Sequence, residues 1–576
     1  MQYRLSFEEA PGYVIRITAE AALPAGAHRF CLPRWRPGRY ELQSFDRNLS
    51  DLRAAAGGDG LPLRQLDSHT WEAVLPAAAV LTLHYRYYAN QPDAGGSYVQ
   101  PDLIYLNPVN FLLYRPEALD APCTLELKLP PAFRTGGALP GPGPVHAFDS
   151  WHELADTPLF VAPDLESLSF EIRGVPTHCW FAGDCKPDAV RLEADIRSYS
   201  EAQFGLFGVI PFREYHYLYL ALPYEYRHGV EHRQSTVIAM GPGHKLMEPA
   251  LYGSLLEISS HELFHAWNVK TMRPADLSPY DYGRPQYSAL HYVTEGVTTY
   301  YGDLMLWKSG IWDLDRWVRS INGELEAHYR MPGHAHTSLE QSSFQSWTNG
   351  YQKGGMPNRR ISFYTKGYLA ALIADFLIRQ ATGNARSLDD AVRLMYQRFG
   401  GQPAGYTAAD YREVLEHVSG ISFGGYWDLV IAGTAPLELY LPEIGAYFGL
   451  ALAPAPLALP ERLLGITVQA EAGKTLVEQV LPGGPAERAG LGPGDELIAI
   501  GGRRIEGNLT EWLAYDEDAR SWELHGFRRK RLFSSTLHRG PERTLPQFVL
   551  LGLPDAQQIR NRDAWQRLPA PEPVRP

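Results

Sequence analysis

The sequence predicts a multidomain α+β protein, and three observations support that prediction. The chain has 576 residues, more than one hydrophobic core usually organises, so three or four domains are expected. Residues 1–170 contain short runs that alternate between apolar and polar, which indicates strands, whereas helical spacing dominates after about residue 250. Residues 451–461 are rich in Pro and Ala, which predicts a linker before a separate C-terminal domain at 462–552.

Composition and charge exclude several classes of protein. An apolar content of 45% is typical of a well-packed globular chain. A formal net charge of −12 disfavours nucleic acid and an anionic membrane surface as partners. Residues 1–7 lack the pattern of a signal peptide, and no run of about 18 apolar residues predicts a membrane span. Four cysteines in so long a chain do not indicate a disulfide scaffold, so a cytoplasmic protein is expected.

The first region, residues 1–170, is expected to be an antiparallel β-domain. Alternation of apolar and polar residues predicts half-buried strands at 13–18, 81–87 and 123–129. Clusters of Gly and Pro between such runs predict loops. In one of these loops, Trp35-Arg36-Pro37-Gly38, the expected role is packing and not chemistry.

The second region, residues 171–450, is expected to begin with a sheet and to continue as helices. Strands are predicted at 215–222 and 234–240, with residues 229–232 on an edge strand just before the second. The predicted helices cover residues 251–267, 290–304, 361–379, 387–399, 407–418 and 426–432.

The helix predicted at 251–267 carries the motif His261-Glu262-Leu263-Phe264-His265. Two histidines four positions apart lie on one face of a helix, so both imidazoles can reach one metal ion. The carboxylate of Glu262 then lies beside the metal, where it can accept a proton from water. The pattern arises by chance in about one of 25 chains of this length, so surface histidines on an ordinary helix are the alternative.

A metal site of this kind needs a third protein ligand. Glu295, thirty positions after His265, lies on the predicted buried helix at 290–304. A lone Glu there is usually a paired core residue, but beside the two histidines it becomes the favoured ligand. His291, one turn earlier, is the rival candidate and is interpreted as structural; the three-histidine metzincin pattern is absent after His265.

These motifs resemble a known family. The histidine motif together with Glu295 resembles the gluzincin zinc peptidases, and its extension to Lys270 resembles the glycyl aminopeptidase family, whose members carry a C-terminal PDZ domain. Leu-Pro-x-Trp-x-Pro-Gly-x-Tyr at residues 32–40 is similar to a motif of that family. Two further matches are Gly229-Val230-Glu231-His232 and Tyr364-Thr365-Lys366-Gly367. The resemblance implies a thermolysin-like catalytic domain at 171–450.

The resemblance also implies a site and an activity. It implies one zinc ion held by His261, His265 and Glu295, with Glu262 as general base and Tyr364 as donor to the transition state. The substrate-binding strand is Gly229, Val230, Glu231 and His232, in which Glu231 holds the free α-amine of a peptide. The implied reaction removes N-terminal Gly, and then Ala, from peptides with a free N-terminus. The side chains proposed to wall the shallow pocket are Tyr292, Tyr300, Tyr301 and Tyr368.

Residues 462–552 resemble a PDZ domain. Leu-Leu-Gly-Ile at 463–466 resembles the carboxylate-binding loop of such domains, and residues 483–498 resemble their core pattern. A PDZ domain can bind the C-terminus of a peptide as an added strand. Because the loop begins with Leu in place of the usual Gly, a docked domain that binds no peptide is the alternative. The Pro-rich tail at 553–576 is expected to be disordered.

Two other functions stay open at this stage. An endopeptidase whose PDZ domain selects substrates by their C-termini would use the same zinc site. A catalytically inactive protein with a peptidase fold would act only as an adaptor through its PDZ domain. The intact His261, Glu262, His265 and Glu295 argue against the adaptor, because a retired site usually loses one of these groups.

Overall fold

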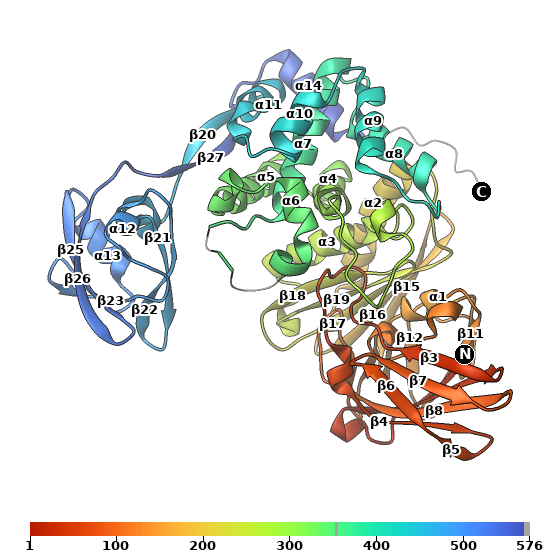
Figure 1. Cartoon of the computed structure of the whole chain (residues 1–576). Helices are drawn as coiled ribbons and strands as arrows, with labels where there is room; N and C mark the ends of the chain where they lie inside the picture. Colours follow the sequence, from red (N-terminus) through yellow and green to blue (C-terminus); the bar gives the residue numbers. More distant parts are fainter. Residues whose placement is uncertain (131, 352–354, 357, 569–576) are drawn as a thin grey trace.

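The computed structural model describes residues 1–130, 132–351, 355–356 and 358–568. Figure 1 shows a β-rich N-terminal domain, a central domain with a sheet and many helices, and a small β-rich domain that a two-stranded ribbon joins to the rest. The predicted multidomain α+β architecture is therefore confirmed.

The N-terminal domain contains three sheets. Their strand orders are β13-β11-β1-β2-β8-β4-β5, β12-β14-β10-β9 and β3-β7-β6. The strands are β1 Gln2–Ser6, β2 Val14–Leu23, β3 Gly26–Cys31, β4 Leu49–Ala56, β5 Asp59–Leu61, β6 Leu63–Asp67, β7 Thr70–Leu75, β8 Ala79–Tyr88, β9 Tyr98–Val99, β10 Ile104–Leu106, β11 Cys123–Lys128, β12 Arg134–Gly136, β13 Val145–Phe148 and β14 Leu159–Ala162, with the short helix α1 at Trp151–Ala155. Strands β1 and β11 pair in parallel, so the predicted antiparallel domain contains one parallel pair.

The central domain is built on the five-stranded sheet β15-β16-β17-β19-β18. Its strands are β15 Glu166–Ile172, β16 Val175–Gly183, β17 Tyr215–Ala221, β18 Tyr226–Glu231 and β19 Ser235–Gly241. Every residue of β17 and β19 is buried, because both faces of the sheet are covered. Tyr217 and Tyr219 face the helices, whereas Leu218 and Leu220 pack against N-terminal residues such as Phe160.

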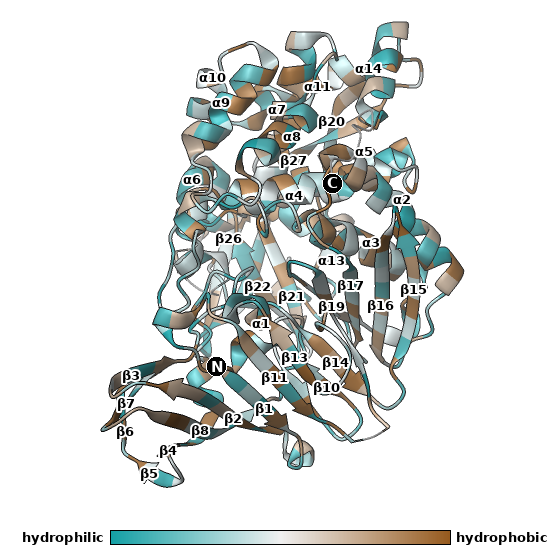
Figure 2. Ribbon diagram, turned by 90° about the vertical axis from the view of Figure 1, so that its right-hand side faces the viewer, coloured by the Kyte–Doolittle hydropathy of each residue, from teal (hydrophilic) through white to brown (hydrophobic). Residues whose placement is uncertain are grey.

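Helices cover the side of this sheet that faces away from the N-terminal domain (Figures 1 and 2). They are α2 Ala189–Phe207, α3 Pro249–Phe264, α4 Thr298–Lys308, α5 Leu314–Tyr329, α6 Leu339–Phe344, α7 Phe363–Thr382, α8 Leu388–Phe399, α9 Ala408–Ser419, α10 Gly424–Tyr426 and α11 Leu441–Phe448. The helix predicted at 290–304 is instead a π-helix, η7 Tyr292–Val297, followed by α4. No helix in the described part of the chain is long and apolar enough to cross a membrane.

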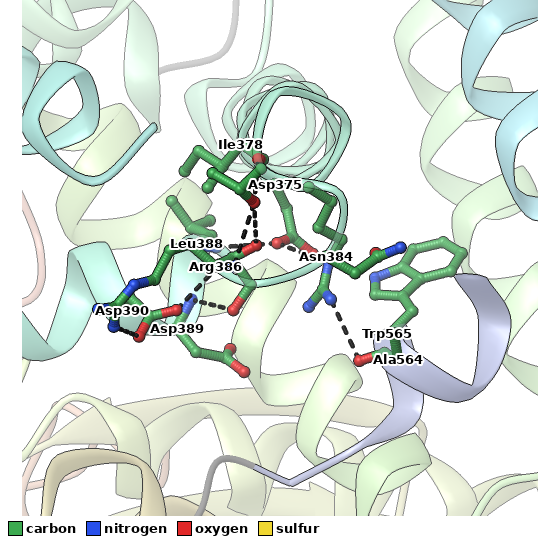
Figure 3. Close-up of polar contacts among 12 residues, drawn as sticks. Asp375, Ile378, Asn384, Arg386, Leu388, Asp389, Asp390, Ala564 and Trp565 are labelled. Carbon is green, nitrogen blue, oxygen red and sulfur yellow. Dashed lines mark hydrogen bonds and ion pairs between the residues drawn. The ribbon is translucent and has the colours of Figure 1, made fainter. Parts of the chain in front are cut away.

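Two predictions for the C-terminal third are wrong. The predicted linker contains β20 Leu450–Pro456, which pairs along its whole length with β27 Thr544–Leu550. The predicted disordered tail contains the helix α14 Ala556–Gln566, which Asp555 caps and whose Trp565 is 1% exposed. Figure 3 shows Ala564 and Trp565 beside residues of α7 and α8. Proline content concealed β20, because strands at an edge tolerate proline. The helix α14 itself contains no proline, but prolines precede and follow it in the sequence. Residues 569–576 lie outside the described residues.

The C-terminal domain has its own apolar core and a sheet in the order β21-β22-β23-β25-β26. Its elements are β21 Ile466–Glu471, β22 Lys474–Val480, α12 Pro485–Arg488, β23 Glu496–Ile500, β24 Arg503–Arg504, α13 Leu509–Tyr515, β25 Ser521–Arg528 and β26 Arg531–His538. Strand β27 belongs to the ribbon, so this domain ends earlier than the predicted residue 552. Gly465, with φ of +72°, forms the turn that enters the edge strand β21.

Candidate active site

Helix α3 carries both predicted histidine ligands at its C-terminal end. It begins at Pro249, a position where the missing N–H costs no helical hydrogen bond. The helix packs between α4 and the strands β18 and β19, and its Leu255 and Leu263 are buried in the central core. His265 follows the last residue of α3 but keeps helical dihedral angles, φ −60° and ψ −22°, so it stays one turn from His261.

The third predicted ligand, Glu295, lies in the π-helix η7. This element contacts α7 closely at two glycines: a Cβ at Gly296 would lie 2.5 Å from the Cα of Gly367. Asn268 connects the loop after α3 to η7 and to the start of α4, because its side-chain amide donates to Val293 O at 2.8 Å and to Thr298 Oγ1 at 3.0 Å. These contacts fix the separation between the histidine helix and Glu295.

The three predicted metal ligands converge. Nε2 of His261 and Nε2 of His265 are 3.0 Å apart, and Glu295 Oε2 lies 3.8 Å from the first and 3.3 Å from the second. The Nδ1 atom of His265 lies 2.8 Å from Asn268 O, so it carries the proton and leaves Nε2 as an acceptor. Two ring nitrogens and one carboxylate oxygen within 4.8 Å of one another form a set that fits a divalent metal.

The charges at these atoms show that the site attracts a cation. Burial acts to lower the pKa of His265, yet Glu295 raises it to about 10. Burial raises the pKa of Glu295 above its usual value, although His265 opposes this shift. These shifts mean that a proton between His265 Nε2 and Glu295 partly balances the buried carboxylate, and a metal ion bound at the same atoms would replace that proton.

A cavity of about 450 Å³, here called the catalytic cavity, opens at these ligands. Its lining includes Glu262, Glu231, Gly38, Gly229 and Tyr364, together with the three ligands. Burial, followed by the carboxylates of Glu231 and Glu295, raises the pKa of Glu262 to about 8, against the lowering effect of His265. Glu262 Oε2 is buried without a hydrogen-bond partner among the described residues, so it is available to a ligand.

Strand β18 brings Glu231 to the catalytic cavity. The strand lies at the edge of the central sheet and pairs with β19, with Glu231 opposite Thr236. The lack of a side chain at Gly229 makes room for Glu262, because a Cβ there would lie 2.1 Å from Glu262 Oε1 and would displace that carboxylate. Glu231 is 4% exposed, and its Oε1 has no partner within the described residues.

The other two residues predicted on the substrate-binding strand lie elsewhere. Val230 is 2% exposed and belongs to the apolar cluster between the sheet and the N-terminal domain. His232 donates from its ring toward Asp156 of the N-terminal domain, with 3.0 Å between Nδ1 and Oδ1. The described lining of the catalytic cavity contains Glu231 and Gly229 but neither Val230 nor His232, because side chains alternate along a strand.

Gly38 is a cavity residue that the sequence did not identify. Arg36 O accepts a hydrogen bond from the N–H of Arg39, and Gly38 has φ of +81°, so residues 36–39 form a tight turn. A Cβ at Gly38 would lie 2.3 Å from Glu231 Oε2. The Pro-Gly dipeptide predicted this turn, but its position against Glu231 depends on how two domains pack.

Tyr364 lies at the start of α7 and lines the catalytic cavity, as predicted from its motif. Its hydroxyl lies 3.0 Å from the hydroxyl of Tyr351, a neighbour that the sequence analysis missed, and also interacts with Glu295. His291 is 0% exposed and packs against Tyr40, with 3.7 Å between the ring centroids. Burial lowers the pKa of His291 to about 3, which fits the structural role predicted for it.

The tyrosines proposed to wall the pocket are core residues. All four are at most 1% exposed and lie outside the described lining of the catalytic cavity; they are Tyr292, Tyr300, Tyr301 and Tyr368. Two of them bind buried carboxylates, because the hydroxyl of Tyr300 donates to Asp375 and that of Tyr301 donates to Asp389. The proposed pocket wall is therefore wrong, since helical spacing alone does not tell which side of η7, α4 or α7 faces the cavity.

The metal-binding triad, the adjacent Glu262 and the edge strand beside them define the class of this protein: it is a metallopeptidase. Residues 254–370 match the family model described as M61 glycyl aminopeptidase, and residues 2–163 match the Peptidase M61 N-terminal domain. Residues 476–515 match the PDZ domain. The catalytic and N-terminal regions of the chain thus match the M61 glycyl aminopeptidase family, and part of its C-terminal region matches the PDZ domain, as its motifs predicted.

A solved structure shares this fold. The crystal structure of an aminopeptidase N family protein from Idiomarina loihiensis superposes with a TM-score of 0.91 at 24% identity, and the match covers 98% of this chain and 99% of that one. An M1 zinc metallopeptidase from Deinococcus radiodurans matches with a TM-score of 0.46 at 14% identity, over 73% of this chain and 90% of that one. Among curated proteins, no sequence matches the chain.

Proposed function

We propose that this protein is a zinc aminopeptidase that removes small N-terminal residues, Gly and then Ala, from peptides with a free N-terminus. The observation that carries the proposal is the catalytic cavity, where a metal-binding triad, a free carboxylate at Glu262 and a second buried carboxylate at Glu231 meet. The first two features support hydrolysis, and the third supports recognition of an ammonium group.

His261, His265 and Glu295 would hold one zinc ion, since two imidazoles and a carboxylate are a common zinc set. When bound, zinc polarises the scissile carbonyl and makes water more acidic. Glu262 accepts the proton of the attacking water at its free Oε2 and later donates it to the departing amine. The Tyr364 hydroxyl donates to the developing oxyanion, a contact worth about 3 kcal/mol by comparison with other oxyanion-hole donors.

Glu231 binds the ammonium group of the substrate, and the turn at Gly38 closes the cavity behind that carboxylate. A peptide with further residues on the N-terminal side of the one held by Glu231 would meet this turn, so the arrangement favours removal of a single N-terminal residue. The edge strand β18 can pair with an extended substrate backbone. In the PDZ domain, we propose that the edge strand β21 accepts the C-terminus of a peptide in the same way.

Hydrolysis of glycyl, alanyl and leucyl arylamides, compared with their N-acetylated forms, tests the proposal. We expect cleavage of the free amines, fastest for glycyl, and loss of activity with a chelator. Faster cleavage of blocked peptides would favour the endopeptidase instead. An inert protein that binds no zinc at equilibrium dialysis would favour the adaptor.

Two substitutions test the assigned roles. Glu262→Gln keeps the shape of the side chain but cannot accept the proton, so we expect a loss of activity of at least about 100-fold with zinc content unchanged. Glu231→Ala removes the ammonium partner, so we expect the preference for free over N-acetylated substrates to fall. A Glu231→Ala protein that kept this preference would contradict the role proposed for Glu231 and would leave the role proposed for Glu262 unaffected.

A further inference from the structure

Asp156 of the N-terminal domain joins two segments of the central domain. It follows helix α1, and its carboxylate accepts three hydrogen bonds across the domain boundary. Oδ1 lies 3.0 Å from Nδ1 of His232 and 2.8 Å from Nζ of Lys270, and Oδ2 lies 2.9 Å from the backbone N of Arg233. All three donors thus belong to the central domain, and the single carboxylate that accepts their hydrogen bonds belongs to the N-terminal domain.

Each of these donors is close in sequence to a group of the active site. His232 and Arg233 come directly after Glu231, at the end of β18. Lys270 comes five residues after His265, and its backbone N–H donates to His265 O at 3.0 Å. The contacts of Asp156 therefore reach both the strand that carries the amine-binding carboxylate and the loop that leaves the metal-binding helix.

The loop held by Lys270 has a strained backbone. Val269, between the metal-binding helix and Lys270, has φ of +134°, a conformation that β-branched residues rarely adopt. Such strain persists only where surrounding contacts hold it. The ammonium group of Lys270 is such a contact, because its side chain is 3% exposed and is paired with Asp156.

Asp156 is ionised in this setting. Burial acts to raise its pKa, but Lys270 and His232 outweigh burial and hold the pKa of Asp156 well below its usual value. Asp156, His232 and Lys270 line a second cavity of about 430 Å³ at the domain junction. The described linings of this cavity and of the catalytic cavity share no residue, so Asp156 does not itself line the proposed substrate site.

We propose that Asp156 is a positioning residue: through His232, Arg233 and Lys270 it sets the place of the Glu231 carboxylate relative to the metal-binding histidines. The N-terminal domain thereby contributes to the amine site in two ways. Gly38 lies next to the Glu231 carboxylate, and Asp156 binds His232, the residue that follows Glu231. This inference rests on the proposed aminopeptidase function.

The test compares the wild type with Asp156→Asn in the full chain. The readout is the ratio of kcat/KM for glycyl arylamide to kcat/KM for its N-acetylated form, together with bound zinc. We expect Asp156→Asn to lower this ratio at least tenfold while zinc content stays constant. The matched control is Asp389→Asn, which breaks another buried ion pair, with Lys308, in the helical part of the central domain. It is expected to lower Tm and to leave the ratio unchanged.

The outcomes are distinguishable. If the wild type itself does not prefer the free amine, the proposed function fails, and this inference fails with it. If the wild type prefers the free amine and Asp156→Asn keeps that preference with zinc bound, the positioning role alone is overturned. If Asp156→Asn does not fold, the same ratio is measured for His232→Leu. This substitution removes the His232 ring as a donor to Asp156 and leaves the ion pair of Asp156 with Lys270 intact. An unchanged ratio in folded His232→Leu overturns the inference, and a lowered ratio supports it.

Discussion

At the scale of single residues, Gly38 gives the sharpest prediction. Its φ of +81° disfavours any side chain, and a Cβ would lie 2.3 Å from Glu231 Oε2. We therefore expect Gly38→Ala to displace the Glu231 carboxylate and to lower kcat/KM for free-amine substrates by roughly 10- to 100-fold, the range for a lost hydrogen bond to a charged group. The measurement is kcat/KM for glycyl arylamide, with zinc content as a check.

Gly57→Ala is the matched control. Gly57 also has a positive φ, +60°, and also lies in the N-terminal domain, but a Cβ there would meet nothing within 4 Å. Both substitutions place a side chain on a residue with positive φ and therefore strain the backbone, but only the Cβ of Gly38→Ala would contact an active-site residue, Glu231. Equal loss of activity in the two variants would show that backbone strain, not the contact with Glu231, is responsible.

The sequence predicted that His261 and His265 lie together, but it did not predict which side chains line the catalytic cavity. His261 and His265 lie on one helix, so the geometry of that helix alone sets the distance between them and the sequence suffices to predict it. The contact of Gly38 with Glu231 and the burial of Tyr300 depend on packing between distant segments. Periodicity shows that a helix has an apolar side, but it does not show whether that side faces a core or a cavity.

At the scale of elements, the crossing of η7 and α7 decides where Glu295 lies relative to Tyr364. The two elements touch at Gly296 and Gly367, where an added Cβ would lie within 3 Å of backbone atoms from either side. We expect Gly296→Ala to force them apart, to destabilise the fold by about 1–3 kcal/mol as overpacking does, and to weaken zinc binding. Thermal unfolding and a zinc titration measure the two effects.

The comparison variant is Gly323→Ala on helix α5, where a Cβ would meet nothing within 4 Å. Alanine is the better helix former, so this change is expected to stabilise by roughly 0.5–1 kcal/mol. A Gly296→Ala protein that also gained stability would contradict the close crossing.

Three predicted helices agree closely with the structure, but two long ones, α2 and α5, were not predicted, although α5 has a clear apolar side. The predictions at 361–379, 387–399 and 407–418 fall within three residues of the ends of α7, α8 and α9. The π-helix at 292–297 was missed, because an inserted residue in a helix leaves almost the same apolar spacing as a regular turn. Glu295 lies in this π-helix, so the element that was hardest to predict carries a proposed metal ligand.

At the scale of the whole molecule, α14 belongs to the central domain although it follows the PDZ domain in sequence. Trp565 stacks on Phe448 at 3.9 Å between ring centroids and donates from Nε1 to the hydroxyl of Tyr300 at 3.2 Å. Asn322 of α5 binds both the N–H and the carbonyl of Phe548 in β27. The chain therefore leaves the central domain at β20, forms the PDZ domain and returns through β27.

Because β20 and β27 pair in antiparallel fashion, with Pro456 opposite Thr544, the two ends of the PDZ insertion are adjacent. Residues 457–543 can then be replaced by an Asn-Gly turn, which joins antiparallel strands directly. We expect the shortened chain to unfold cooperatively, to bind zinc and to cleave glycyl arylamide within about threefold of the full chain, since domains are independent folding units. Loss of zinc binding or of cooperative unfolding would show instead that contacts such as that between Asn358 and Val480 O are needed to form the active site.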